Sequence, residues 1–261
     1  MAAFDLDTYV ERSRAVDLSA IDWAEVPRYP VPPETLRTLR YMQDIESHTI
    51  IYLRSLLATR AIDDPEVSTF LACWLYEETF HGLALSRFLT AYGESVQAPR
   101  RSRMPLSEWF DALASRVLSL TWPDFVALHM TWGAINELTT LTGYERLIAV
   151  AGHPILSELL ARIMRDEARH FGFYYRQAEK RLVRPSTARL TRFIVEHFWG
   201  PVGIDVAGAD ETRALARCLL TGPEGQAAAR KIDTTIRRLP GLDGVRLVQS
   251  WLAREVPASG H

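Results

Sequence analysis

The chain has little cysteine and no long apolar run. Cys73 and Cys218 are the only cysteines, and they form no CxxC motif. This argues against a disulfide scaffold or a cysteine-built zinc site, and it fits a reducing cytoplasm. No stretch approaches the roughly 18 consecutive apolar residues of a membrane span. No positively charged start precedes an apolar run, so we expect no signal peptide.

Lysine is almost absent, because Lys180 and Lys231 are the only two and arginine carries nearly all the positive charge. The formal net charge is −2, so no global field attracts nucleic acid or a membrane surface. With 261 residues, 48% of them hydrophobic, the chain can bury a sizeable core without disulfide or metal staples. These features predict a cytoplasmic globular protein with no nucleic-acid or membrane partner.

Glycine and proline cluster at a few breaks, and the segments between them have helical periodicity. The pattern predicts four long helices at about 34–61, 65–92, 122–151 and 154–183. Shorter helices are expected at about 5–16, 106–119, 186–199, 210–220, 224–238 and 243–254.

The connection between the second and third long helices is much longer than the others, as in ferritin-like bundles. The predicted fold class is therefore all-α, a ferritin-like four-helix bundle with a long crossover and extra N- and C-terminal helices. We expect one domain over 1–261, with a core bundle at about 34–183 and a helical extension at about 184–256.

Each long helix carries a glutamate in the middle of the stripe that should be apolar. In the second and fourth helices a histidine follows three residues later on the same face. The stripes are, in chain order, Leu39, Met42, Glu46, Ile50, Leu53, Leu57; Leu71, Trp74, Glu78, His81, Leu85, Phe88; Val126, Met130, Gly133, Glu137, Leu141, Tyr144; and Leu156, Leu160, Ile163, Glu167, His170, Tyr174.

Buried carboxylates are costly when unpaired, and four at one level of a bundle would repel one another. Two divalent cations would cancel the four charges. Mixed carboxylate and imidazole ligands favour iron or manganese over calcium or magnesium. The pattern therefore predicts two iron ions per chain, with manganese as an alternative. The predicted metal ligands are Glu46, Glu78, His81, Glu137, Glu167 and His170.

Each of these residues alone has a simpler explanation. A glutamate in a stripe can form a salt bridge, a core histidine is commonly structural, and one ExxH occurs by chance. All six in register, with ExxH repeated, favour the metal site. Glu77 also reaches His81 at i,i+4, but the shared register of the two motifs favours Glu78 and Glu167. Residues expected to be structural or exposed are Asp44, His48, His129, Glu145, His153, His197 and His261.

The two histidine motifs carry a family resemblance. They are Glu77-Glu78-Thr79-Phe80-His81-Gly82 and Asp166-Glu167-Ala168-Arg169-His170. They resemble the E-E-x-x-H-G and D-E-x-R-H motifs of the soluble acyl-carrier-protein (acyl-ACP) desaturases. Glu137-Leu138-Thr139-Thr140 is similar to the Glu-x-x-Thr of that family. The resemblance covers about residues 34–183.

This resemblance implies an O2-dependent diiron oxidase that abstracts hydrogens from an acyl chain or related substrate to form an alkene. Thr140 and Asp166 would be catalytic, with Thr140 near the oxygen-binding face and Asp166 oriented toward His81. Trp23 is the candidate to complete the relay from Asp166. The implied partners are O2, a ferredoxin-type electron donor, an acyl carrier protein and a second copy in a homodimer.

Alternatives remain open because the chain is shorter than plant desaturases and differs after the fourth long helix. They are a diiron oxygenase that hydroxylates or N-oxygenates a small metabolite, a ferroxidase or iron-binding protein, and a metal-free scaffold. N-oxygenases of this superfamily usually add a third histidine ligand, which the stripes do not supply. The basic run Arg100, Arg101 and Arg103 is either a docking site for an acidic carrier or a solvated loop. Trp74, Phe80, Trp132, Phe171 and Phe173 could line an apolar pocket or form plain core.

Overall fold

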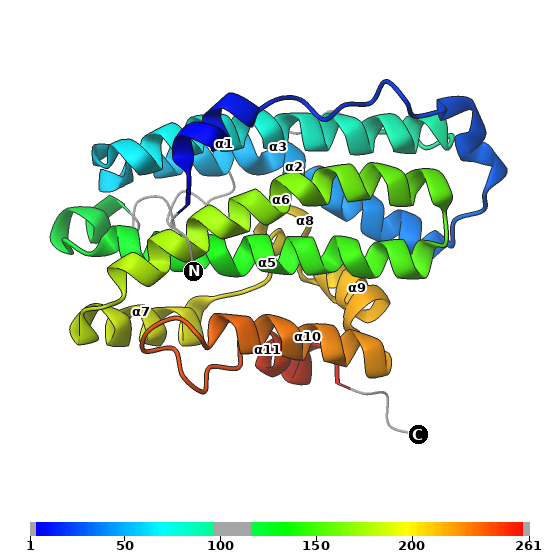
Figure 1. Cartoon of the computed structure of the whole chain (residues 1–261). Coiled ribbons are helices and arrows are strands. Elements are labelled where there is room, and N and C mark those ends of the chain that lie inside the picture. The colour runs from blue at the N-terminus through cyan, green and yellow to red at the C-terminus, as the bar shows by residue number, and fades with distance from the viewer. Residues whose placement is uncertain (1–3, 97–115, 258–261) are drawn as a thin grey trace.

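A computed structural model describes residues 4–96 and 116–257, which are helical and contain no strand. Four long helices lie side by side (Figure 1), namely α2 (Pro33–Leu56), α3 (Pro65–Ala91), α5 (Phe125–Ala151) and α6 (Pro154–Arg181). Helix α2 packs on α3 and α5 packs on α6, each as an antiparallel pair joined by a short connection. The all-α prediction is confirmed, and the four long helices begin and end within a few residues of the expected positions.

Shorter helices flank the four long ones. They are α1 (Leu6–Arg12), η1 (Trp23–Arg28), η2 (Arg60–Asp63), α7 (Pro185–Phe198), α8 (Ile204–Ala207), α9 (Ala209–Leu220), α10 (Gly222–Ile236) and α11 (Leu247–Glu255). Most of the helix expected at 106–119, and the basic run Arg100, Arg101 and Arg103, lie outside the described residues. None of the helices in 4–96 and 116–257 is long and apolar enough to span a membrane.

Local signals set the ends of the long helices. Proline at the first position, where no N–H partner is needed, begins α3 and α6. Gly152 ends α5 with a φ of 59°, in the left-handed region that favours glycine. The α5–α6 connection is therefore very short, and residues at the middle of one helix lie level with the middle of the other.

The α2 helix ends at Leu56, earlier than expected, because the Thr59 side chain accepts a hydrogen bond from the Ala61 N–H and starts η2. Leu57 consequently lies beyond the helix and is exposed, although the stripe placed it in the core. Ile50 is exposed as well, and nothing in the described structure explains this position.

The apolar core is divided into two clusters along the length of the bundle. One includes Leu53, Phe70, Leu71 and Phe173, and the other includes Leu39, Leu85, Phe88, Leu156 and Leu160. The glutamates and histidines of the four stripes occupy the level between these clusters. A polar layer therefore crosses the middle of the bundle.

Helices α7 to α11 form a second layer, called here the C-terminal layer. Helix α9 contacts both α2 and α5, α7 and α10 contact α5, and α8 contacts α2. Figure 1 shows α7, α10 and α11 beside α5, on the side away from α3. This layer therefore covers the two long helices that carry single glutamates.

Candidate metal centre

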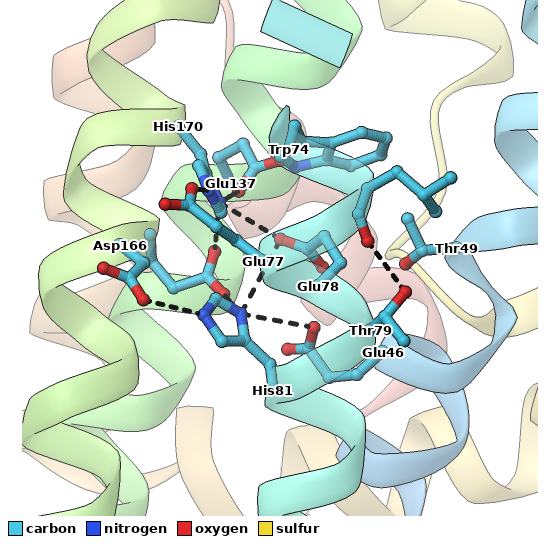
Figure 2. Close-up of polar contacts among 12 residues, drawn as sticks. Glu46, Thr49, Trp74, Glu77, Glu78, Thr79, His81, Glu137, Asp166 and His170 are labelled. Carbon is cyan, nitrogen blue, oxygen red and sulfur yellow. Dashed lines mark hydrogen bonds and ion pairs between the residues drawn. The ribbon is translucent and has the colours of Figure 1, made fainter. Parts of the chain in front are cut away.

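The six predicted ligands converge at the polar layer. Glu46 comes from α2, Glu78 and His81 from α3, Glu137 from α5, and Glu167 and His170 from α6. Each is at most 7% exposed, so water screens none of them well. Figure 2 shows the side chains of both histidines between carboxylates contributed by neighbouring helices.

The six side chains form two overlapping groups able to hold a metal ion. One group is Glu46, Glu78, His81 and Glu167, and the other is Glu78, Glu137, Glu167 and His170. In each group the candidate ligand atoms all lie within 4.8 Å of one another. Glu78 and Glu167 belong to both groups, so they would contribute to both sites if two cations were bound.

Distances from the histidines fit coordination of common ions. His81 Nδ1 is 3.1 Å from a Glu167 oxygen and 3.8 Å from a Glu46 oxygen. His170 Nδ1 is 3.1 Å from a Glu78 oxygen and 3.7 Å from a Glu137 oxygen. Two ligands that each bind an ion at about 2.1 Å lie roughly 3 to 4 Å apart. The side chains can therefore take cations without large movement.

Unsatisfied polar atoms test whether a metal pair suits this centre. Five buried atoms here have no hydrogen-bond partner in residues 4–96 and 116–257, namely Glu46 Oε2, Glu78 Oε1, His81 Nδ1, Glu167 Oε1 and His170 Nδ1. Leaving one such atom unpaired costs about 1–3 kcal/mol. All five belong to the two ligand groups, and carboxylate oxygen with imidazole nitrogen suits iron or manganese. The donor set fits two such ions.

Carboxylates on the outer side orient both histidines. His81 Nε2 is 3.2 Å from Asp166 Oδ2, and His170 Nε2 is 2.7 Å from Glu77 Oε2. Each contact holds the opposite ring nitrogen toward the centre, as is usual for metal-binding histidines. Arg169 joins the two carboxylates, at 2.8 Å from Glu77 and 2.7 Å from Asp166. Asp166 thus lies beside His81, where the resemblance implied.

The relay differs from the one expected. Trp23 packs against the guanidinium of Arg87, 4.5 Å from the ring centroid, and within the described residues it donates no hydrogen bond to Asp166. The Tyr9 hydroxyl instead donates to Glu77 Oε2 at 2.8 Å, on the His170 side. The signal for Glu77 was present in the sequence, because an acid precedes the ligand glutamate in both histidine motifs.

Each of the two unshared glutamates accepts one hydrogen bond from an aromatic side chain. The Tyr144 hydroxyl donates to Glu46 Oε1, and Trp74 Nε1 donates to Glu137 Oε1 at 3.0 Å. One oxygen of each carboxylate is thereby occupied, and the other remains for a cation. Sequence analysis missed both donors, because tyrosine and tryptophan on a stripe look like ordinary core.

The carboxylates strongly influence one another in the absence of cations. Burial, followed by the charges of Glu78 and Glu167, raises the pKa of Glu46 well above its ordinary value. Burial and the same two neighbours raise the pKa of Glu137. Burial alone would lower the pKa of His81, but the neighbouring carboxylates of Asp166 and Glu167 raise it to about 9. Cations would displace the protons held here, so metal binding should release protons.

A pocket lies beside Glu46. On the bundle side its lining includes Glu46, Thr140, Gly143 and Tyr144. The C-terminal layer and the loop after α7 close the other side with Trp199, Val202, Leu215, Ala216, Leu219 and Trp251, among others. Thr140 and the predicted ligand Glu46 therefore line the same pocket.

The aromatic residues considered for a pocket do not line this one. Trp74 and Phe173 belong to the buried core, and Trp132 and Phe171 pack against it. Phe80 contacts Tyr76, with ring centroids 4.9 Å apart.

Of the histidines considered structural or exposed, His153 is buried and its side chain accepts a hydrogen bond at the start of α6, whereas His197 is exposed. Asp44 and Glu145 are both exposed, and Glu145 pairs with Lys231.

Comparisons with family models, curated proteins and solved structures find no match for this chain. The ferritin-like arrangement and the desaturase resemblance therefore remain predictions from the sequence motifs. What the chain does must be inferred from the chemistry of the centre and of its pocket.

Proposed function

We propose that this chain is an O2-dependent diiron oxidase of the acyl-ACP desaturase type, built on a ferritin-like bundle. The observation that carries the proposal is the pair of overlapping ligand groups, which share Glu78 and Glu167. Five buried oxygen and nitrogen atoms of these groups have no hydrogen-bond partner among the described residues and could therefore coordinate a metal ion. Four carboxylates against two Fe2+ ions give no net charge, which removes the repulsion within the polar layer.

Two bound irons would supply the redox capacity to activate O2 toward an unactivated C–H bond. The overall reaction balances when the substrate loses two hydrogen atoms and O2 takes up two further electrons and two protons. The products are an alkene and two molecules of water. The two electrons require an external donor of the ferredoxin type.

The protein residues divide the remaining tasks. Asp166 and Glu77 hold His81 and His170 in the tautomer that leaves Nδ1 free for a cation. Thr140 lines the pocket beside Glu46, where its hydroxyl could donate a proton as oxygen is reduced. The almost entirely apolar pocket wall keeps bulk water away from the reacting bond.

A diiron oxygenase that hydroxylates a small metabolite is the second candidate, because the same centre and pocket would serve it. N-oxygenation is less favoured. Within the described residues the two ligand groups contain only the histidines His81 and His170, and His129 instead contacts the Tyr52 hydroxyl at 3.1 Å. An iron-storage protein would not need an apolar pocket beside the metal centre, so iron storage is less favoured than an oxidase or oxygenase.

The first experiment is elemental analysis of protein grown with iron. About two irons per chain are expected for the native sequence, and loss of iron is expected in Glu78→Ala and Glu167→Ala. Glu145→Ala is the matched control, because Glu145 is an exposed glutamate of α5. Native protein without iron or manganese would refute the proposal.

Activity then separates the candidates. Iron-loaded protein would be given a reduced ferredoxin, O2 and a series of acyl-ACPs, and the products analysed by mass spectrometry. Loss of two mass units indicates desaturation, and a gain of sixteen indicates hydroxylation. Size-exclusion chromatography tests the implied homodimer, and a 24-subunit cage would favour iron storage.

A further inference from the structure

We infer that the substrate reacts through an uncharged, apolar part held by the C-terminal layer, and that it reaches the centre only on the Glu46–His81 side. This inference rests on the proposed function, since it assigns the substrate pocket of the same oxidase. It concerns residues after 183, which the family resemblance does not cover.

The pocket approaches the centre from one side. Of the six predicted ligands, only Glu46 is part of the pocket lining. On the other side, Trp74 covers Glu137 through a 3.0 Å hydrogen bond. The rings of Phe70 and Tyr9 lie with centroids 6.2 and 6.3 Å from that of His170. The two ligand groups are therefore unequal in their access to a substrate.

Among the described residues the lining contains no lysine, arginine or histidine, and Glu46 is the only charged residue in it. A carboxylate or phosphate inside the pocket would find no basic side chain to pair with and would face Glu46, which is costly in a buried site. Most polar groups of the wall are already occupied. Trp199 donates to Asn136, and the Tyr41 hydroxyl donates to the Val202 carbonyl. An uncharged, apolar ligand matches this wall.

Thr140 and Trp251 are the exceptions among these polar groups. Within the described part of the chain neither the Thr140 hydroxyl nor the Trp251 indole N–H has a hydrogen-bond partner, and Thr140 lines the pocket together with Glu46. A ligand with its reacting carbons beside Thr140 would lie next to the Glu46–His81 group. The rest of an apolar ligand would extend along the α9 and α11 walls, and any charged end must remain outside.

Gly143 and Ala216 set the width of the pocket from opposite walls. A Cβ atom at Gly143 would lie 2.9 Å from Met42 Cε and 3.8 Å from Leu219 Cδ1. Ala216 is a small, buried residue of α9 in the facing wall. Larger side chains at either position should narrow the pocket without touching the predicted ligands.

Binding of Nile red, an uncharged apolar dye, tests the pocket in metal-free protein by fluorescence. One site per chain is expected, and 1-octanol should displace the dye at least tenfold more effectively than octanoate. Equal displacement by the two competitors would overturn the preference for an uncharged ligand. A chain that fails to bind the dye would overturn the pocket assignment.

Variants locate the dye. Ala216→Phe should weaken Nile red binding at least tenfold while iron content stays near two per chain. Leu215→Trp, at a half-buried position of the same wall, serves if circular dichroism shows that Ala216→Phe is unfolded. Ala227→Phe is the control, because Ala227 is exposed on α10 and does not line the pocket. Unchanged binding in the folded pocket variants would place the dye elsewhere and refute the inference.

Dye binding without any metal binding would refute only the proposed function.

One-sided access is tested with Co2+, whose absorption spectrum reports its coordination. Glu137→Ala retains the Glu46–His81 group, and Glu46→Ala retains the Glu137–His170 group. After cobalt content is measured, 1-octanol should change the spectrum of Glu137→Ala and leave that of Glu46→Ala unchanged. Equal changes in both variants, or a change only in Glu46→Ala, would overturn access from the Glu46 side.

Discussion

Glu77 and His170 lie 93 residues apart in the chain, yet Glu77 Oε2 and His170 Nε2 are 2.7 Å apart across the α3–α6 interface. Asp166 makes the corresponding contact with His81. Each histidine motif therefore supplies the carboxylate that orients the histidine of the other motif. This exchange makes the two motifs one structural unit.

Glu77→Gln should weaken binding of one metal ion and largely spare the other. The loss should be about 10- to 100-fold, because a neutral amide holds the His170 ring less firmly. Asp166→Asn should weaken the ion beside His81 instead. Competition with a chromophoric chelator measures both affinities, with Glu145→Gln as the exposed control. If each variant lost the same affinity for both ions, the assignment of Glu77 to the ion beside His170 and of Asp166 to the ion beside His81 would be contradicted.

Glu46→Gln should have opposite effects on stability with and without metal. In metal-free protein it removes a carboxyl group whose ionisation is opposed by burial and by Glu78 and Glu167, and the free energy of unfolding should rise by roughly 1–2 kcal/mol. With Mn2+ at about 100 times its Kd, the native chain gains about 2.7 kcal/mol that the variant largely loses. Urea denaturation with a chelator and with Mn2+ measures both. A variant less stable in both conditions would contradict the prediction.

Gly133 and Gly172 should respond differently to alanine. A Cβ at Gly133 would lie 2.3 Å from the Tyr174 ring, whereas one at Gly172 would lie 3.9 Å from Phe4. Gly172→Ala should raise the free energy of unfolding by up to about 1 kcal/mol through helix propensity. Gly133→Ala should lower it, because overpacking costs about 1–3 kcal/mol. Thermal unfolding of the pair compares them, and stabilisation by Gly133→Ala would show that Tyr174 moves freely.

Because of His129, the free energy of unfolding should decrease as the pH is lowered from 7 to 5. Burial lowers its pKa to about 3, and the ordinary value of about 6.5 applies to the unfolded chain. Between these values the unfolded state binds more protons, so this histidine lowers the free energy of unfolding as pH falls, by up to about 1.4 kcal/mol per unit. Urea denaturation of metal-free protein at pH 7 and pH 5 should show a weaker pH dependence for His129→Gln. His197→Gln, at an exposed position, should behave like the native chain.

The helices and the convergence of six residues could be predicted because their signals are local. Glu46, Glu78, Glu137 and Glu167 each interrupt an apolar stripe, and a stripe needs only its own helix. Proline and glycine mark where the helices begin and end, and therefore set the level at which the glutamates meet. Leu57 was misplaced because the short η2 helix, which has no stripe, follows directly.

The contacts around the centre could not be predicted in the same way. Glu77 finds His170 on another helix, and Trp74 and Tyr144 look like core residues until their donor atoms are placed. The pocket depends on how the C-terminal layer lies over α2 and α5. The sequence pattern of α9 or α11 does not specify where these helices pack on α2 and α5. The pocket residues that they contribute could therefore be identified only from the structure.

The polar layer between the two apolar clusters has a consequence for cooperativity. We expect the two clusters of metal-free protein to unfold as separate units, because the layer that joins them consists of carboxyl groups that disfavour one another's ionisation. Calorimetry should then give a van 't Hoff enthalpy smaller than the calorimetric enthalpy, the signature of more than one unfolding step. Cations bound by all four long helices would connect the units, and the two enthalpies should converge. The ions that make the chemistry feasible would also make the bundle unfold as one body.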